Sequence, residues 1–288
     1  MIGVKSEWMA VLLDESGNTK QVVDWHKNTI TNTGLNAFWL STCFVEEFDS
    51  ICVGTGTDEP AATDTELTNE VDYAMCDDIP TPTFTVGGSC AADFMATFGV
   101  GSAVGSLTEA GLRNSQSDVL WCHNLFTENG SPVVIEKATS DTLIVTVRVT
   151  LTTSTTYASG TSPNHKICMT GDGLMHLFDR GISSLTPGKI GTGGTAPSID
   201  DTGIRGDVYG TPCYEPATIG APSNGEVLVT FDIPALYWAG AGTWREWVPT
   251  DEDGNLTAGS FRWVSDGAQT KDNTHSIRFT MKYKLERA

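Results

Sequence analysis

The residues that first suggest chemistry lie in two glycine-rich segments that resemble each other. Residues 53–71 read VGTGTDEPAATDTELTNEV, and residues 190–208 read IGTGGTAPSIDDTGIRGDV. Glycine-rich loops bind phosphates when lysine and serine or threonine follow, or when a third glycine opens a helix. Here a proline follows instead. We therefore interpret both segments as tight turns in which two stretches of backbone approach closely.

The two segments align without a gap, and a glutamate further along each half keeps the same offset of 137 residues. A repeat separated by about half the chain predicts two structural units of one kind. We assign the matched positions a structural role and expect no catalytic, cofactor-binding or metal-binding residues among them. They are Gly54, Gly56, Pro60, Asp64, Thr65 and Glu109 in the first half, and Gly191, Gly193, Pro197, Asp201, Thr202 and Glu246 in the second.

Two acidic turns, Asp14–Asn18 and Asp251–Asn255, raise the question of calcium. The second opens with the Asp-x-Asp-x-Asn spacing of a calcium-binding loop. Its glycine, Gly254, comes two places early, and Arg262 occupies the twelfth position, where a bidentate glutamate belongs. We predict that both turns join the strands of hairpins and bind no metal.

Nothing in the sequence singles out a catalytic centre. There is no Gly-x-Ser-x-Gly elbow, no His-Glu-x-x-His pair and no recognisable pairing of cysteine with histidine. A pair of carboxylates for glycoside hydrolysis stays open, because any two of 36 acidic residues could meet in space. We expect a protein that is not an enzyme. Its five histidines should be hydrogen-bonded or exposed: His26, His123, His165, His176 and His275.

The eight tryptophans leave one alternative open. Four lie in apolar strand or helix patterns and read as core residues: Trp8, Trp25, Trp39 and Trp121. The other four are less clearly buried and could form a carbohydrate-contacting surface: Trp238, Trp244, Trp247 and Trp263.

Charge and cysteine content exclude several classes of protein. Thirty-six acidic and 17 basic residues give a formal net charge of −19, which repels phosphate backbones and argues against sequence-independent nucleic-acid binding. There is no basic head with an apolar core at the N-terminus and no run of 18 apolar residues, so we expect neither a signal peptide nor a membrane span.

The cysteines are odd in number and irregularly spaced, which predicts free thiols in a reducing cytoplasm: Cys43, Cys52, Cys76, Cys90, Cys122, Cys168 and Cys213.

The elements that must position these residues are mostly strands. Apolar runs on both sides of Asp14–Asn18 predict a hairpin, and strict alternation over 145–151 and 277–285 predicts antiparallel strands with one wet face. A short helix is expected from Gly34 to about Phe44, capped by Thr33. Its apolar stripe recurs in the second half, where Asp172 takes the capping place; the two stripes are Leu35, Phe38 and Trp39, and Leu174, Leu177 and Phe178.

We therefore expect a mainly β fold. It consists of two tandem antiparallel β-rich, sandwich-like units, each with one short α-helix. The Ser/Thr/Gly-rich stretch 152–163 is the expected boundary, which gives residues 1–158 and 159–288.

The order of the motifs resembles the N-terminal domain of tail-collar fibre proteins of tailed bacteriophages. The resemblance covers most of residues 28–151, with a degenerate second copy over about 166–286. It is carried by Asn28–Leu35, Val53–Gly56, Pro60, Asp64–Leu67, Asn69–Val71 and Glu109–Leu112. The second copy departs from the pattern, because Trp247-Val-Pro249 replaces Ala-Gly-Leu after the glutamate. No long fibre shaft follows in this chain, so the resemblance implies an attachment or adaptor module rather than a complete fibre.

These observations predict a structural protein of a tailed-phage virion, assembled in the host cytoplasm and located in the tail, collar or baseplate. It would bind other virion proteins, such as tail-tube, baseplate, collar or fibre proteins, as a symmetric homo-oligomer. We expect no cofactor and no binding to nucleic acid or membranes. Two alternatives remain: a head fibre or capsid-decoration protein, and a host-surface carbohydrate-binding protein or depolymerase.

Overall fold

The computed structural model describes most of the first half of the chain and the strands of the second half. The fold is mainly β with several antiparallel sheets, as predicted, and the described part contains two named helices. The described residues are 2–85, 88–128, 130–153, 158–159, 165–169, 175, 177–178, 186–191, 208–213, 217–234, 242–250, 261–271 and 277–288.

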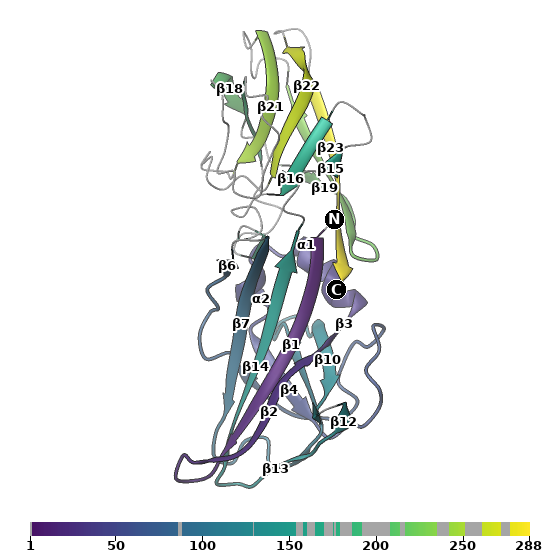
Figure 1. The fold of residues 1–288 in the computed structure, drawn as a ribbon. Coiled ribbons are helices and arrows are strands. Elements are labelled where there is room, and N and C mark those ends of the chain that lie inside the picture. The colour runs from purple at the N-terminus through teal and green to yellow at the C-terminus, as the bar shows by residue number, and fades with distance from the viewer. Residues whose placement is uncertain are drawn as a thin grey trace.

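One eight-stranded sheet combines strands from both predicted halves. Its order is β19-β20-β23-β1-β14-β7-β6, with β2 paired to β1. The strands are β1 (Ile2–Leu13), β2 (Thr19–Lys27), β6 (Thr83–Thr85), β7 (Ser89–Phe98), β14 (Thr142–Thr152), β19 (Thr218–Ile219), β20 (Glu226–Ile233) and β23 (Ile277–Arg287). β1 pairs antiparallel with β14 along its length and parallel with β23 at its start, where Ile2 faces Leu285. The N-terminal strand thus joins the two halves (Figure 1).

A five-stranded antiparallel sheet packs against the first-half part of this sheet. Its order is β3-β10-β9-β4-β5. The strands are β3 (Thr29–Ile30), β4 (Ser50–Gly54), β5 (Glu70–Met75), β9 (Glu109–Arg113) and β10 (Leu120–Leu125). Two short ribbons close one end of the sandwich: β8 (Gly105–Leu107) with β13 (Ile135–Lys137), and β11 (Thr127–Glu128) with β12 (Ser131–Pro132).

The third sheet belongs to the second half and has the order β15-β16-β22-β21-β17-β18. Its strands are β15 (Ala158–Ser159), β16 (His165–Met169), β17 (Thr186–Gly191), β18 (Val208–Cys213), β21 (Gly242–Thr250) and β22 (Phe261–Lys271). From β16 onward this order matches β3-β10-β9-β4-β5 strand for strand.

The register of the two sheets also matches. Gly54 faces Glu109 across β4 and β9, and Gly191 faces Glu246 across β17 and β21, each residue 137 positions further along. Likewise, Ile30 faces Cys122 across β3 and β10, and Met169 faces Phe261 across β16 and β22. Met169 and Phe261 lie 139 positions after Ile30 and Cys122, respectively. The backbone around the two glycine motifs is therefore paired alike. The boundary near residue 158 and the loops of the second unit stay a prediction.

The first-half helix begins earlier than predicted. α1 (Asn32–Leu40) is capped by Thr31, whose Oγ1 accepts the N–H of Gly34 at 2.9 Å, so the assignment of the cap to Thr33 was wrong. Thr31 is better placed because its N–H also bonds Trp121 O, which anchors the helix start to β10. The helix ends at Leu40, and a separate short helix, α2 (Phe44–Glu47), follows.

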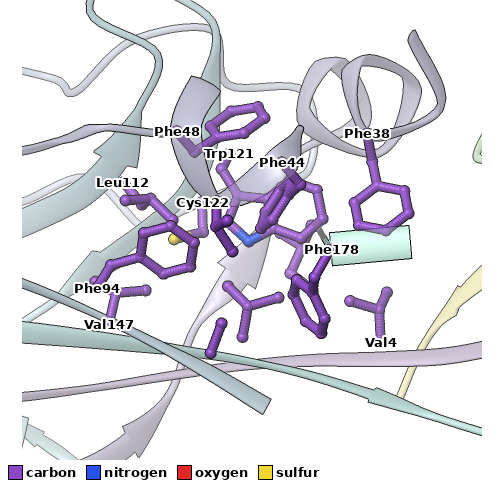
Figure 2. Close-up of a cluster of buried hydrophobic side chains, with 14 of the residues drawn as sticks. Val4, Phe38, Phe44, Phe48, Phe94, Leu112, Trp121, Cys122, Val147 and Phe178 are labelled. Atoms are coloured by element: carbon purple, nitrogen blue, oxygen red, sulfur yellow. The ribbon is translucent and has the colours of Figure 1, made fainter. Parts of the chain in front are cut away.

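The predicted apolar stripes meet in one shared core. The α1 stripe is buried, as are Leu177 and Phe178 of the second stripe, whereas Leu174 lies outside the described residues. Phe178 contacts Phe44 with 5.7 Å between ring centroids, and Phe44 contacts Trp121 at 4.8 Å (Figure 2). The indole N–H of Trp39 donates to Gly225 O at 2.8 Å. Side chains of both halves therefore stabilise the same interior.

We expect all seven thiols to be free, and the buried ones to react slowly in the native state. Cys52, Cys76, Cys90 and Cys122 form no disulfide in the part of the chain that the structure describes, and burial raises the pKa of Cys122 to about 12, so little thiolate forms near neutral pH. Alkylation after denaturation without reductant should label seven cysteines in mass spectrometry. A stoichiometric disulfide, including one between Cys168 and Cys213, would contradict this prediction.

Candidate functional site

The motif residues of the first half converge on one buried carboxylate. Glu109 on β9 is fully buried, and both of its carboxylate oxygens accept backbone N–H groups. Oε1 accepts from Gly56 and Asn69, each at 2.8 Å, and Oε2 accepts from Thr68 at 3.0 Å. A buried carboxylate is tolerated only when such partners replace water. Glu109 thus holds the two ends of the loop formed by residues 55–69.

His123 on β10 extends this arrangement and was not among the predicted site residues. Its Nε2 lies 2.9 Å from Oε2 of Glu109, and its Nδ1 lies 2.7 Å from Oδ2 of Asp64. Asp64 also accepts the N–H of Ala61 at 2.8 Å, and the imidazole is buried. We call Asp64, His123 and Glu109 the loop clamp.

The ionisation of the loop clamp follows from its hydrogen bonds. Burial by itself would raise the pKa of the Glu109 carboxyl, but the bonds from His123 and from three backbone N–H groups lower it below its ordinary value. Burial would likewise lower the pKa of His123, but its bonds to the two carboxylates raise it. The two carboxylates on either side of the ring therefore favour the protonated form of His123.

The glycines of the motif are required by contact with Glu109. A Cβ atom at Gly56 would lie 2.5 Å from Glu109 Oε1 and 2.5 Å from Thr68 Cβ, and a Cβ at Gly54 would also collide with Glu109 Oε1. Pro60 is half-buried and Thr65 exposed, both within the loop. Of the twelve predicted motif residues, the structure brings together Gly54, Gly56, Asp64 and Glu109.

The second half is described in less detail. Gly191 and Glu246 face each other across neighbouring strands, and Gly193, Pro197, Asp201 and Thr202 lie outside the described residues. His123 directly follows Cys122, which pairs with Ile30. Arg262 directly follows Phe261, which pairs with Met169 at the equivalent place in the third sheet, so Arg262 on β22 is the counterpart of His123 on β10. The equivalent position therefore carries a side chain that stays cationic at any physiological pH.

A signal for His123 was present in the sequence. β9 and β10 form an antiparallel hairpin in which Gly111 faces His123, and Glu109 is two residues from Gly111. Side chains at diagonal positions of a hairpin lie on the same face. Placing Glu109 and His123 together therefore required only the register of the hairpin formed by β9 and β10.

The loop clamp has the residue types of a catalytic site but not the geometry. A general base needs a free lone pair directed at a substrate. Both ring nitrogens of His123 are engaged by carboxylates, and both oxygens of Glu109 are engaged by N–H groups. Among the described residues, no group of three or more His, Cys, Asp or Glu side chains is arranged to hold a metal ion. The geometry suits a structural role.

No protein-family model, curated protein or solved structure matches the chain. In the part that the structure describes, no helix is long and apolar enough to cross a membrane. The function is therefore inferred from the geometry of the chain itself.

We expect the clamp to make stability depend on pH in two directions. The raised pKa of His123 contributes stability that is complete below its unfolded-state pKa of about 6.5 and is lost as the pH rises through the folded-state value. The lowered pKa of Glu109 contributes stability above about 4.5 that is lost as the pH falls. The clamp should therefore stabilise the fold most between about pH 4.5 and 6.5.

Urea unfolding at pH 5.5, 7 and 8.5 measures this effect. In the wild type, the free energy of unfolding should decrease as the pH rises above about 6.5. This decrease should be smaller in the His123→Gln variant and unchanged in the His26→Gln variant. Identical pH profiles for wild type and His123→Gln would show that the imidazole is not protonated in the clamp.

Proposed function

We propose that this chain is a structural protein of a tailed-phage virion, an adaptor in the tail, collar or baseplate that holds fibres or neighbouring tail proteins. One observation carries the proposal: Asp64 and Glu109 of the tail-collar-like motif, together with His123, fix a surface loop, and both ring nitrogens of His123 and both oxygens of Glu109 are engaged in doing so. A surface loop whose conformation is fixed by buried hydrogen bonds suits a protein that binds partners through that surface.

The loop is held at several points along its length. Glu109 binds the two ends of the loop. The middle of the loop is held by the contact of Asp64 with His123 and by a hydrogen bond from Asn32 N–H to Ala62 O at 2.7 Å. Thr108 Oγ1 also donates to Gly56 O at 2.6 Å. Its tip, from Thr57 to Glu59, remains exposed. A loop that is ordered before binding avoids most of the entropic cost of ordering at an interface.

Analysis of purified particles tests the proposal. Mass spectrometry should find the chain in virions, immunogold labelling should place it on the tail, and deletion of its gene should give DNA-filled heads without fibres or adjoining tail parts. The isolated chain should not hydrolyse host polysaccharide, peptidoglycan or nucleic acid. Gold on the head would favour a head fibre or decoration protein, and complete particles from the deletion would overturn the adaptor role.

A second candidate function is carbohydrate binding, and one hollow favours it. A cavity of about 570 Å³ lies on the outward face of the eight-stranded sheet. Beside it, Arg148 pairs with both oxygens of Asp93 and stacks over the Trp25 ring at 4.4 Å. Its lining includes five hydroxyl side chains: Thr81, Thr83, Thr85, Ser89 and Thr150.

Hydroxyl groups, a neutral ion pair and a nearby aromatic ring are the groups that recognise an uncharged sugar. Ala91 lines this hollow, so the larger side chain of an Ala91→Leu variant should reduce its volume. Glycan-array binding by the wild type that Ala91→Leu removes would support this candidate, and equal signals from both chains would exclude the hollow as the sugar site.

A further inference from the structure

Exposed apolar side chains concentrate along one edge of the first-half sandwich. Of the twelve large hydrophobic residues that are exposed in the described part of the chain, seven lie between positions 71 and 104. We call this surface the β5 edge; it comprises Val71, Tyr73, Met75, Ile79, Met95, Val100 and Val104. Contiguous exposed apolar surface on a folded protein usually marks a binding site.

The segments that carry these residues lie side by side. The N–H of Asp77 donates to Met95 O at 2.7 Å, which joins the chain after β5 to β7. The carboxylate of Asp72 accepts from Ser102 Oγ at 2.6 Å and from Ala103 N–H at 2.8 Å, which joins β5 to the loop after β7. These bonds bring the segments that carry the exposed apolar side chains to the same edge of the sandwich.

The position of this surface at a sheet edge is informative. β5 is the last strand of the five-stranded sheet, and its side chains alternate between exposed Val71, Tyr73 and Met75 and half-buried Asp72 and Ala74. Exposed edge strands with apolar side chains readily accept another chain, and proteins normally protect them. Val71, Tyr73 and Met75 stay exposed although Arg113 stacks over the Tyr73 ring at 4.7 Å, and an exposed apolar edge strand of this kind is consistent with a partner.

The charges beside the β5 edge indicate the chemistry of that partner. A hollow of about 480 Å³ opens there, with Val45, Met75 and Ile79 as its apolar wall. Cys76 and four carboxylates form the rest of its lining, with no basic side chain; the carboxylates are those of Glu46, Asp49, Asp77 and Asp78.

Two of these carboxylates have hydrogen-bond partners among the described residues. Asp49 accepts from the N–H and Oγ of Ser115, and Asp77 accepts from the N–H and Oγ1 of Thr97. Glu46 and Asp78 are exposed, and their carboxylates accept no hydrogen bond and form no ion pair with any residue that the structure describes. The hollow thus offers two uncompensated negative charges beside an apolar wall.

We propose that the β5 edge docks an extended segment of a neighbouring virion protein, in which a lysine or arginine is flanked by apolar residues. The cationic head enters the hollow between Glu46 and Asp78, and its aliphatic stem packs against Met75 and Ile79. The flanking apolar residues cover Tyr73 and Val71. This inference rests on the proposed adaptor function and names the surface and the partner chemistry through which it acts.

Photo-crosslinking in assembled particles tests the proposal. The full chain carries a photoreactive phenylalanine analogue at Ile79, or, as a control, at Val22, which is similarly exposed on β2. Ile79 should crosslink to a different virion protein, within a segment that contains lysine or arginine beside apolar residues, and Val22 should not crosslink to that segment. A crosslink to a second copy of this chain, to an acidic segment, or to nothing would overturn the proposal.

Charge variants provide an independent test. Glu46→Lys with Asp78→Lys should lower incorporation of the chain into particles at least tenfold, and Glu46→Gln with Asp78→Asn should lower it less. The matched control is Glu15→Lys with Glu128→Lys, which makes the same change in net charge at exposed sites elsewhere and should incorporate normally. Equal thermal midpoints of all chains show that folding is unchanged.

The outcomes separate the two proposals. Normal incorporation of the Glu46 and Asp78 variants would overturn the docking surface and leave the adaptor function standing. Absence of the wild-type chain from particles would instead overturn the adaptor function itself.

Discussion

Replacing Glu109 with alanine is expected to lower the free energy of unfolding by about 4 kcal/mol, because removing one partner of a buried charge pair usually costs about 3–5 kcal/mol. The change would leave the imidazole of His123 with one carboxylate neighbour in place of two. It would also leave the N–H groups of Gly56, Thr68 and Asn69 without acceptors inside the fold. Urea unfolding followed by circular dichroism near pH 6 measures this loss.

Two further variants test whether the loss of stability comes from removing the buried carboxylate of Glu109. Glu136→Ala removes an exposed glutamate that accepts a hydrogen bond from Ser106 Oγ, and it should cost less than about 0.5 kcal/mol. Glu109→Gln keeps the shape of the side chain but replaces one acceptor oxygen with a donor, so it should still be strongly destabilising. A loss below about 1 kcal/mol for Glu109→Ala would mean that water replaces the carboxylate and that the clamp does not hold the loop.

Replacing Gly56 with valine is expected to cost about 3 kcal/mol or more, since overpacking of a well-packed site typically costs about 1–3 kcal/mol and here the neighbours are a fixed carboxylate and backbone-anchored Thr68. A side chain at this position separates the loop from Glu109 and breaks the bond from Gly56 N–H. In infected cells the same variant should give DNA-filled particles that lack fibres or adjoining tail parts.

Gly99→Val is the matched control for this substitution. A Cβ atom at Gly99 meets no other atom within 4 Å, so valine there should leave stability and assembly nearly unchanged. Gly193→Val tests the repeat, since the predicted duplication makes position 193 the counterpart of position 56. An effect of Gly56→Val no larger than that of Gly99→Val would show that the close approach to Glu109 can relax.

Much of the local structure was predictable because it depends on neighbouring residues in the chain. Alternation over 145–151 predicted a strand with one buried face, and β14 buries Val145, Val147 and Val149. The turn Asp14–Asn18 closes the hairpin of β1 and β2, with the Asp14 carboxylate accepting the N–H groups of Ser16 and Asn18. The helix cap was misplaced by two residues because its anchor, Trp121 on β10, is distant in sequence.

The sequence by itself determined that the alternating segments 145–151 and 277–285 are strands, that the first hairpin turns at Asp14–Asn18, which stripe of α1 is buried, and that the two halves carry one pattern. These properties follow from side-chain periodicity and turn chemistry, which act over a few residues. Only the tertiary structure decided that Glu109 is a buried hydrogen-bond acceptor for residues 40 to 53 positions away. It alone placed His123 between two carboxylates and Phe178 against Phe44. The physical reason is that burial and charge pairing depend on the register and packing of distant strands, which no local pattern encodes.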